Sequence, residues 1–167
     1  ALVTNYFSKW YHVAIREMAN QPGFKLDSSW IQARLNFTVP ISEISKAIEF
    51  LMQNKLIRVK PDGTFTAGDE RLTCDGEVYR FVLTHFYKQS FELAGQSIDN
   101  TERQNRKMRS HTVSLSPEQF QKARDIVDRA VDELARLSDQ PADGSSVYQF
   151  LLLGFPLSNG RTGGENE

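Results

Sequence analysis

The chain has 167 residues, and its 20 Lys and Arg against 21 Asp and Glu give a formal net charge of −1. Such a balance excludes a protein that coats nucleic acid or an anionic membrane by bulk charge, because coating needs a clear basic excess. The single cysteine, Cys74, excludes an internal disulfide and fits a reducing compartment. No apolar run reaches the roughly 20 residues that span a bilayer. We therefore expect a cytoplasmic protein without a membrane span.

The first third of the chain carries three helical patterns. Apolar residues recur at spacings of three and four over residues 7–15, and Gln21-Pro22-Gly23 ends that helix. A second helix is predicted near residues 29–35. A third is predicted over residues 41–54, where apolar side chains again repeat at three and four.

A hairpin pattern follows the third helix. Residues 56–59 and 64–66 read as two short strands, and Pro61-Asp62-Gly63 between them is a strong turn signal. Three short helices closed by a hairpin form the winged-helix arrangement. We therefore predict a winged helix-turn-helix domain over residues 1–73.

The second half predicts a helix, a strand, a helix and a strand. Residues 77–98 have a helical apolar face, and a polar loop follows over residues 99–110. Residues 111–115 alternate like a half-buried strand, and the apolar run 147–155 fits a strand buried on both faces. Between them, residues 117–138 have a single apolar stripe.

The helix over residues 117–138 has a sharply defined start. Ser116 can cap it, Pro117 suits its first turn, and Gln119 can complete a capping box. The Gly-rich polar residues 158–167 are predicted to be a disordered tail.

The predicted fold class is therefore α+β, with the winged helix-turn-helix followed by a helix-strand-helix-strand region. We assign residues 74–157, which hold this second region, to dimerisation or effector binding. Two strands make a poor sheet on their own, so a second copy of the chain is an expected partner.

Several short segments and single residues carry a family resemblance: Tyr6 to Glu17, Pro22-Gly23-Phe24-Lys25, Trp30-Ile31, Ala47, Leu51, Leu56, Val147-Tyr148 and Phe155-Pro156-Leu157. They resemble a family of bacterial winged-helix proteins of largely uncharacterised function. The resemblance implies a transcription regulator, usually with an additional N-terminal helix-turn-helix-like segment. We therefore also expect a partner besides a second copy: either this N-terminal segment or another protein. The family tends to have Ser or Thr followed by Pro where this chain has Pro40-Ile41.

The third helix and the hairpin are the predicted DNA contacts. DNA-reading helices present Arg, Lys, Asn, Gln or Ser on their outer face. The candidates here are Ser42, Ser45, Lys46, Arg58 and Lys60. Few phosphate contacts per copy predict weak binding by one copy, because each neutralised phosphate adds separately to affinity. The alternative is a protein-interaction module without direct DNA binding, since Glu43 and Glu49 share the helix.

A second basic cluster precedes the strand predicted over residues 111–115. It consists of Arg103, Arg106, Lys107 and Arg109, next to His111. The cluster could hold a phosphate, a nucleotide or an acidic partner. The alternative is a solvated loop whose charges meet the acidic residues of the helix after Pro117.

Enzymatic functions find little support in the sequence. It has no Gly-rich phosphate loop and no Cys and His spacing typical of a metal site. The three histidines are scattered, and Cys74 has no recognisable catalytic setting. We therefore expect neither an enzyme nor a cofactor or metal ion.

Overall fold

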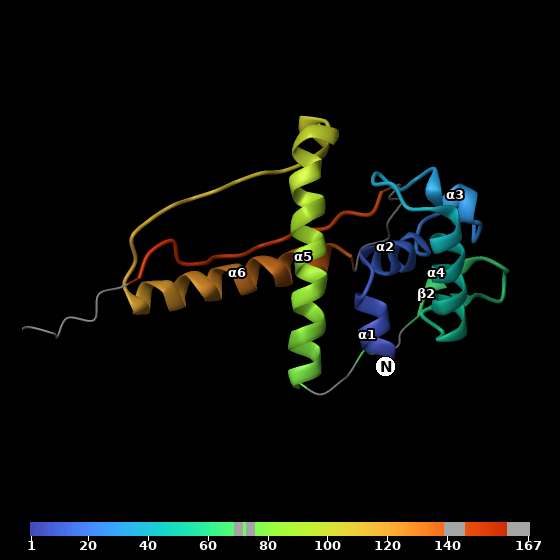
Figure 1. The fold of residues 1–167 in the computed structure, drawn as a ribbon, viewed down its shortest axis with the longest axis horizontal. Helices are drawn as coiled ribbons and strands as arrows, with labels where there is room; N and C mark the ends of the chain where they lie inside the picture. Colours follow the sequence, from blue (N-terminus) through green and yellow to red (C-terminus); the bar gives the residue numbers. More distant parts are fainter. Residues whose placement is uncertain (69–71, 73–75, 139–145, 160–167) are drawn as a thin grey trace, which may run out of the picture. The chain divides into compact units, whose positions relative to one another are not determined.

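The computed structural model describes residues 1–68, 72, 76–138 and 146–159. Within these ranges 56% of the residues are helical and 4% lie in strands. The elements (Figure 1) are α1 (Leu2–Phe7), α2 (Trp10–Met18), α3 (Ser28–Gln32), α4 (Ile41–Gln53), β1 (Ile57–Val59), β2 (Phe65–Ala67), α5 (Gly76–Asn100), the 3₁₀ helix η1 (Arg103–Asn105) and α6 (Pro117–Leu137). The protein is a helical fold, so the predicted α+β class, a winged helix-turn-helix followed by helix-strand-helix-strand, is wrong.

Both strands predicted in the second half are absent from the described residues. Residues 111–115 and the described residues 147–155 belong to no helix or strand. The sheet that the described residues form consists of β1 and β2 alone, paired antiparallel. A strand exists only through hydrogen bonds to a neighbour, whereas alternation records only which side chains are apolar. The pattern therefore predicted strands where the chain supplies no partner for them.

The chain divides into two compact units. Unit 1 comprises residues 1–109 and 142–148, and unit 2 comprises residues 110–141 and 149–167. Helices α1 to α5 thus belong to unit 1, and α6 belongs to unit 2. Among the described residues, no helix combines the length and the apolar character needed to cross a membrane.

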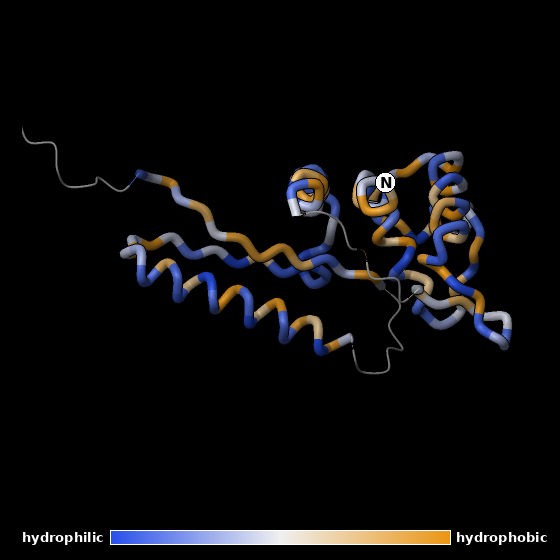
Figure 2. The backbone as a smooth tube through the Cα atoms, turned by 90° about the horizontal axis from the view of Figure 1, so that it is seen from below, coloured by the Kyte–Doolittle hydropathy of each residue, from blue (hydrophilic) through white to orange (hydrophobic). Residues whose placement is uncertain are grey.

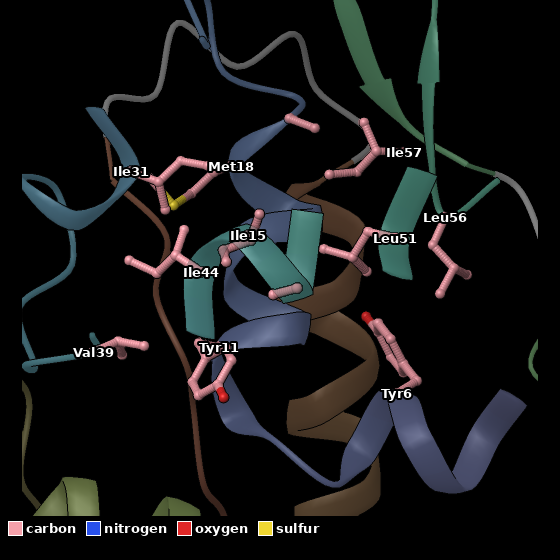
Figure 3. Packing of buried hydrophobic residues seen from close by; sticks show 12 residues of the cluster. Tyr6, Tyr11, Ile15, Met18, Ile31, Val39, Ile44, Leu51, Leu56 and Ile57 are labelled. Carbon is pink, nitrogen blue, oxygen red and sulfur yellow. The ribbon is translucent and has the colours of Figure 1, made fainter. Parts of the chain in front are cut away.

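The core of unit 1 lies between α2, α3, α4 and the start of the hairpin (Figure 3). Apolar side chains spaced three or four residues apart fall on one face of α2 and on one face of α4, which brings the two faces together. This core cluster contains Tyr6, Tyr11, Ile15, Met18, Ala19, Ile31, Val39, Ile44, Ala47, Leu51, Leu56 and Ile57.

The junction of α1 and α2 interrupts the single helix that the sequence predicts. Lys9 has extended backbone angles of φ −134° and ψ 123°. The side chain of Gln89 on α5 binds both sides of this break: its Oε1 accepts from the Trp10 N–H at 3.1 Å, and its Nε2 donates to the Ser8 carbonyl at 3.0 Å. Figures 1 and 2 show α5 alongside α1. The break therefore depends on a helix almost 80 residues away, which satisfies the backbone groups that it frees.

A Schellman motif at the end of α4 turns the chain into the hairpin. Lys55 lies in the left-handed region with φ 58°. Its N–H donates to the Met52 carbonyl at 3.1 Å, and the Leu56 N–H donates to the Leu51 carbonyl at 2.9 Å. Leu51 and Leu56 are both fully buried, as the apolar contact of this motif requires. The motif fixes the direction in which β1 leaves α4.

The chain leaves the hairpin beside the end of α4. The Gly68 N–H donates to the Leu56 carbonyl at 2.8 Å, and the Arg16 guanidinium donates to the Gly68 carbonyl. A Cβ atom at Gly68 would overlap the carbonyl oxygen of Lys55. This close backbone approach, which only glycine permits, seals the hairpin against the end of α4.

His12 is a buried titratable group of unit 1. Its Nδ1 lies 3.0 Å from the Asn5 carbonyl and 3.2 Å from the Tyr6 carbonyl, and its ring stacks on Phe50 at 5.0 Å between centroids. Burial lowers the pKa of His12 below 6.5 and outweighs the two carbonyl hydrogen bonds, which act in the opposite direction. The folded protein therefore resists protonation of this ring.

The free energy of unfolding should consequently fall as the pH drops below 6.5. The unfolded chain takes up a proton on His12 near pH 6.5, whereas the folded chain takes it up only near its lower pKa. The free energy of unfolding therefore falls between these two pKa values. Urea unfolding of wild type and His12→Gln at a series of pH values from 6.5 downward tests this. The free energy of unfolding should depend less on pH in the variant than in wild type. His85→Gln, at an exposed histidine of α5, is the control and should keep the wild-type profile. Equal slopes for wild type and His12→Gln would contradict the assignment.

In unit 2, the predicted start of α6 is confirmed. The Ser116 side chain accepts from the Gln119 N–H at 3.2 Å, and the Gln119 side chain accepts from the Ser116 N–H at 2.9 Å. Pro117 occupies the first helical position, where a backbone N–H would have no partner within the helix, so proline costs no hydrogen bond there. The complete capping box explains why this helix end could be predicted to the residue.

Candidate nucleic-acid interface

Helices α3 and α4 form a fixed pair in unit 1. Asp27 caps α3 by accepting from the Trp30 N–H at 2.7 Å. The Ser28 and Ser45 hydroxyls lie 2.8 Å apart and join the two helices on their exposed side. Ile31 and Ile44 pack below in the core cluster. The pair is thus held at both the surface and the core.

The first turns of α4 carry three of the predicted DNA contacts. Ser42 and Lys46 are exposed. Ser45 is less available, because its hydroxyl donates to the Ile41 carbonyl at 3.0 Å in addition to its contact with Ser28. Pro40 stands at the N-cap and supplies no side-chain hydrogen bond. The first turn of α4 therefore has no side-chain cap, and its Glu43 N–H donates to the Pro40 carbonyl at 3.0 Å instead.

The charge on this face of α4 is paired. The Lys46 ammonium lies 2.9 Å from one carboxylate oxygen of Glu43, and the Tyr11 hydroxyl donates to the other at 3.2 Å. The hydrogen bond from Lys46, followed by that from Tyr11, lowers the pKa of Glu43, so this carboxylate stays ionised. Burial and the Glu43 contact together raise the pKa of Tyr11 to about 12. An anion that binds Lys46 must therefore compete with Glu43.

Arg58 and Lys60 lie on the hairpin. Arg58 is half-buried in β1 opposite Thr66, and Lys60 is exposed where the turn begins. The turn is well formed: Gly63 has φ 81°, and the Asp62 carboxylate accepts from the Thr64 N–H at 2.9 Å and from its hydroxyl at 2.6 Å. These bonds lower the pKa of Asp62, which keeps a negative charge close to Lys60. The predicted residues thus lie on two elements of one unit, α4 and the hairpin.

Aromatic contacts hold the hairpin against α3. The ring centroids of Phe24 and Phe65 are 5.7 Å apart, and those of Phe24 and Trp30 are 5.5 Å apart, both edge to face. Such pairs contribute about 0.5–1.5 kcal/mol beyond their buried area. Phe24 therefore links β2 to α3.

Arg34 is a surface cation of this region that the predicted DNA contacts do not include. Its guanidinium lies 4.1 Å from the centre of the Trp30 ring, and the residue is exposed just after α3. A stacked guanidinium keeps its N–H edges free for a phosphate while its orientation is restricted. The available signal was a cation four residues after a tryptophan at a helix end, a spacing that allows contact.

The second basic cluster forms no enclosed site in the described residues. Arg103 lies in η1 beside an open depression lined by Glu102, Arg103 and Gln104, and the Gln104 side chain donates to the Glu102 carboxylate at 2.8 Å. Arg106 Nη1 contacts the Met108 sulfur at 3.3 Å, and Lys107 and Arg109 are exposed. Across the described ranges, no group of three or more His, Cys, Asp or Glu side chains could hold a metal ion.

Comparison with known proteins gives one result. No curated protein matches the chain, and no solved structure matches it. A family model does match residues 3–157, which is nearly the whole length. The chain therefore belongs to the family described as a domain of unknown function, DUF4423.

Proposed function

We propose that this protein is a DNA-binding regulator of transcription, acting in the cytoplasm, in which unit 1 contacts the phosphate backbone through α4 and the hairpin. One observation carries the proposal: a braced helix pair, α3 and α4, continues directly into a hairpin whose turn carries the exposed Lys60. A helix of this kind can lie in a major groove while a hairpin reaches the adjacent backbone.

The expected mode is positioning on phosphates, with little reading of bases. Lys46, Lys60 and Arg34 are exposed cations on this part of unit 1, and Ser42 adds a hydroxyl at the start of α4. Glu43 and Asp62 stand beside two of the three cations and weaken their attraction for phosphate. Each neutralised phosphate contributes a salt-dependent increment to affinity, so three contacts predict weak binding by one copy that falls steeply with salt.

Fluorescence anisotropy with labelled duplex DNA at about 50 mM salt tests the proposal. Lys60→Glu should weaken binding about 10-fold and lower the slope of log affinity against log salt by about one. Lys88→Glu, an equal charge reversal at an exposed position on α5, is the matched control and should leave binding close to wild type. Absence of binding to every duplex at this salt, or equal losses in the two variants, would overturn the proposal.

A specific observation favours a second function, recognition of a protein. The network of Tyr11, Glu43 and Lys46 gives the exposed start of α4 both signs of charge, which suits a polar protein surface better than a polyanion. On this alternative, the double variant Lys46→Glu with Lys60→Glu keeps its biological activity, whereas DNA binding predicts that this activity is lost. An expression assay of a regulated promoter separates the two.

A further inference from the structure

The charge of the chain is unevenly distributed along the sequence, and its cations are densest in the second basic cluster. Residues 103–117 contain four Lys and Arg and no Asp or Glu. The rest of the chain has 16 Lys and Arg against 21 Asp and Glu, a formal net charge of −5. The four cations of the cluster, Arg103, Arg106, Lys107 and Arg109, lie within seven residues and belong to unit 1. The near-neutral total therefore conceals one strongly basic segment.

The second basic cluster is open to solvent and has no strand beside it. After η1, Arg106 has extended backbone angles of φ −137° and ψ 153°, and the chain from there to α6 belongs to no helix or strand. Figure 1 shows an extended trace beyond the end of α5. Three of the four cations, Arg103, Lys107 and Arg109, are exposed. A ligand can therefore reach the cluster without displacing packed side chains.

The cations of the cluster form no ion pair within the described part of unit 1. The carboxylate that lies nearest in sequence, that of Glu102, accepts from the Gln104 side chain at 2.8 Å. The Arg106 guanidinium contacts the Met108 sulfur at 3.3 Å from Nη1, and a thioether sulfur is a weak acceptor. Its Nε is shielded from solvent and has no acceptor among the described residues. An N–H group that has lost water without gaining an acceptor is costly, and a phosphate oxygen would supply that acceptor.

The residue types of the cluster favour a nucleic-acid backbone as the ligand. Three of its four cations are arginines, whose planar guanidinium can donate two parallel N–H bonds to one phosphate. Gln104 and Asn105 between them can donate to further phosphate oxygens. A membrane surface would require large apolar side chains beside the cations, and Met108 is the one apolar residue of positions 103–109. Some DNA-binding domains use an extended arginine-bearing arm to reach a groove beside the one that their helix occupies.

We propose that the second basic cluster is a second DNA contact of unit 1, which binds phosphates in addition to those that α4 and the hairpin bind. This inference rests on the proposed function, because it takes DNA as the polyanion that unit 1 binds. Lys46 and Lys60 each have a carboxylate close by, whereas the cations of the cluster have none paired with them in the described part of unit 1. The cluster therefore supplies the larger share of the salt-dependent affinity.

Fluorescence anisotropy of the full chain with a labelled duplex at about 50 mM salt measures this share. Arg106→Gln with Arg109→Gln should weaken binding about 30-fold or more and lower the slope of log affinity against log salt by about two, because two phosphate contacts are lost. Arg129→Gln with Arg136→Gln is the matched control: it removes the same charge from exposed positions of α6 and should stay close to wild type. Arg106→Lys with Arg109→Lys keeps the charge and should keep the salt slope, which a merely structural role would not explain.

Limited cleavage by trypsin locates the contact. Trypsin cuts after Arg and Lys, so the free protein should be cut after Arg106, Lys107 and Arg109, and saturating duplex should slow these cuts at least about 10-fold. A poly-glutamate chain with as many charges as the duplex tests the other class of partner, an acidic protein. It should bind more weakly than DNA, because carboxylates spaced along a flexible chain do not reproduce the phosphate backbone.

The outcomes separate this inference from the proposed function. Suppose that wild type binds DNA and Lys60→Glu weakens binding, but Arg106→Gln with Arg109→Gln does no more than the α6 control. The inference alone is then overturned. Equal cleavage with and without DNA, or poly-glutamate binding as tight as DNA, would also overturn it. Loss of binding in the cluster variant without any effect of Lys60→Glu would instead overturn the hairpin contact and support the cluster. Absence of binding to every duplex would overturn both.

Discussion

Replacing Leu51 by alanine should lower the free energy of unfolding of unit 1 by about 3–4 kcal/mol. Leu51 is fully buried on α4, where it belongs to the core cluster, and its carbonyl closes the Schellman motif with Leu56. Truncation removes several buried methyl and methylene groups and leaves a cavity, because the motif holds the surrounding backbone in place. A loss of this size is a large part of the stability of a small domain.

Urea unfolding followed by tryptophan fluorescence measures this loss in unit 1. Both tryptophans, Trp10 and Trp30, are half-buried against the core cluster, so the signal reports on this unit. Ile41→Ala is the control, because Ile41 is 45% exposed at the start of the same helix. It should cost less than about 1 kcal/mol. Equal losses for the two variants would show that the buried side of α4 is assigned wrongly.

The second large effect is expected at Gly68. Gly68→Ala should destabilise unit 1 by about 3 kcal/mol, the upper end of the cost of inserting one methyl group into a packed site. The added Cβ meets a backbone carbonyl, that of Lys55, which cannot rotate away as a side chain would. The hairpin must then move away from α4, and the bond from the Gly68 N–H to the Leu56 carbonyl lengthens or breaks.

Gly95→Ala is the matched control for Gly68→Ala. It makes the same chemical change in the same unit, but a Cβ at Gly95 has no heavy atom within 4 Å to collide with. Because Gly95 lies within α5, this variant should gain about 0.5–1 kcal/mol from helix propensity. The two variants should therefore shift the urea midpoint in opposite directions. A neutral Gly68→Ala would mean that the hairpin does not close on Lys55.

Local sequence patterns predicted those parts of the fold that depend on local interactions. The turn signal at Asp62-Gly63 gave the hairpin, and Ser116 with Gln119 gave the start of α6, because capping and turn chemistry act within a few residues. Local patterns could not predict contacts between residues that are distant in sequence. Residues 111–115 alternate without a neighbouring strand, and the break at Lys9 is stabilised by Gln89.

The candidate interface shows the same division. Exposure of Ser42, Lys46 and Lys60 agrees with the helical and hairpin patterns, because those patterns fix which side of an element faces outward. Pairing between side chains does not follow from periodicity alone. The hydroxyl contact of Ser28 with Ser45 requires the relative placement of two helices, and that contact reduces the value of Ser45 as a DNA contact.

The two hydrogen bonds between the Gln89 side chain and the backbone of Ser8 and Trp10 have a consequence for synthesis on the ribosome. The backbone groups of Ser8 and Trp10 acquire this partner only after about 80 further residues have been translated, which takes roughly 4–16 s at usual elongation rates. Until then the bonds with Gln89 are missing, and a continuous helix through Ser8 and Lys9 is opposed by local contacts such as those of His12 with the Asn5 and Tyr6 carbonyls. The break between α1 and α2 is therefore expected to be less firmly fixed in the nascent chain than in the folded protein, and it becomes fixed when α5 arrives.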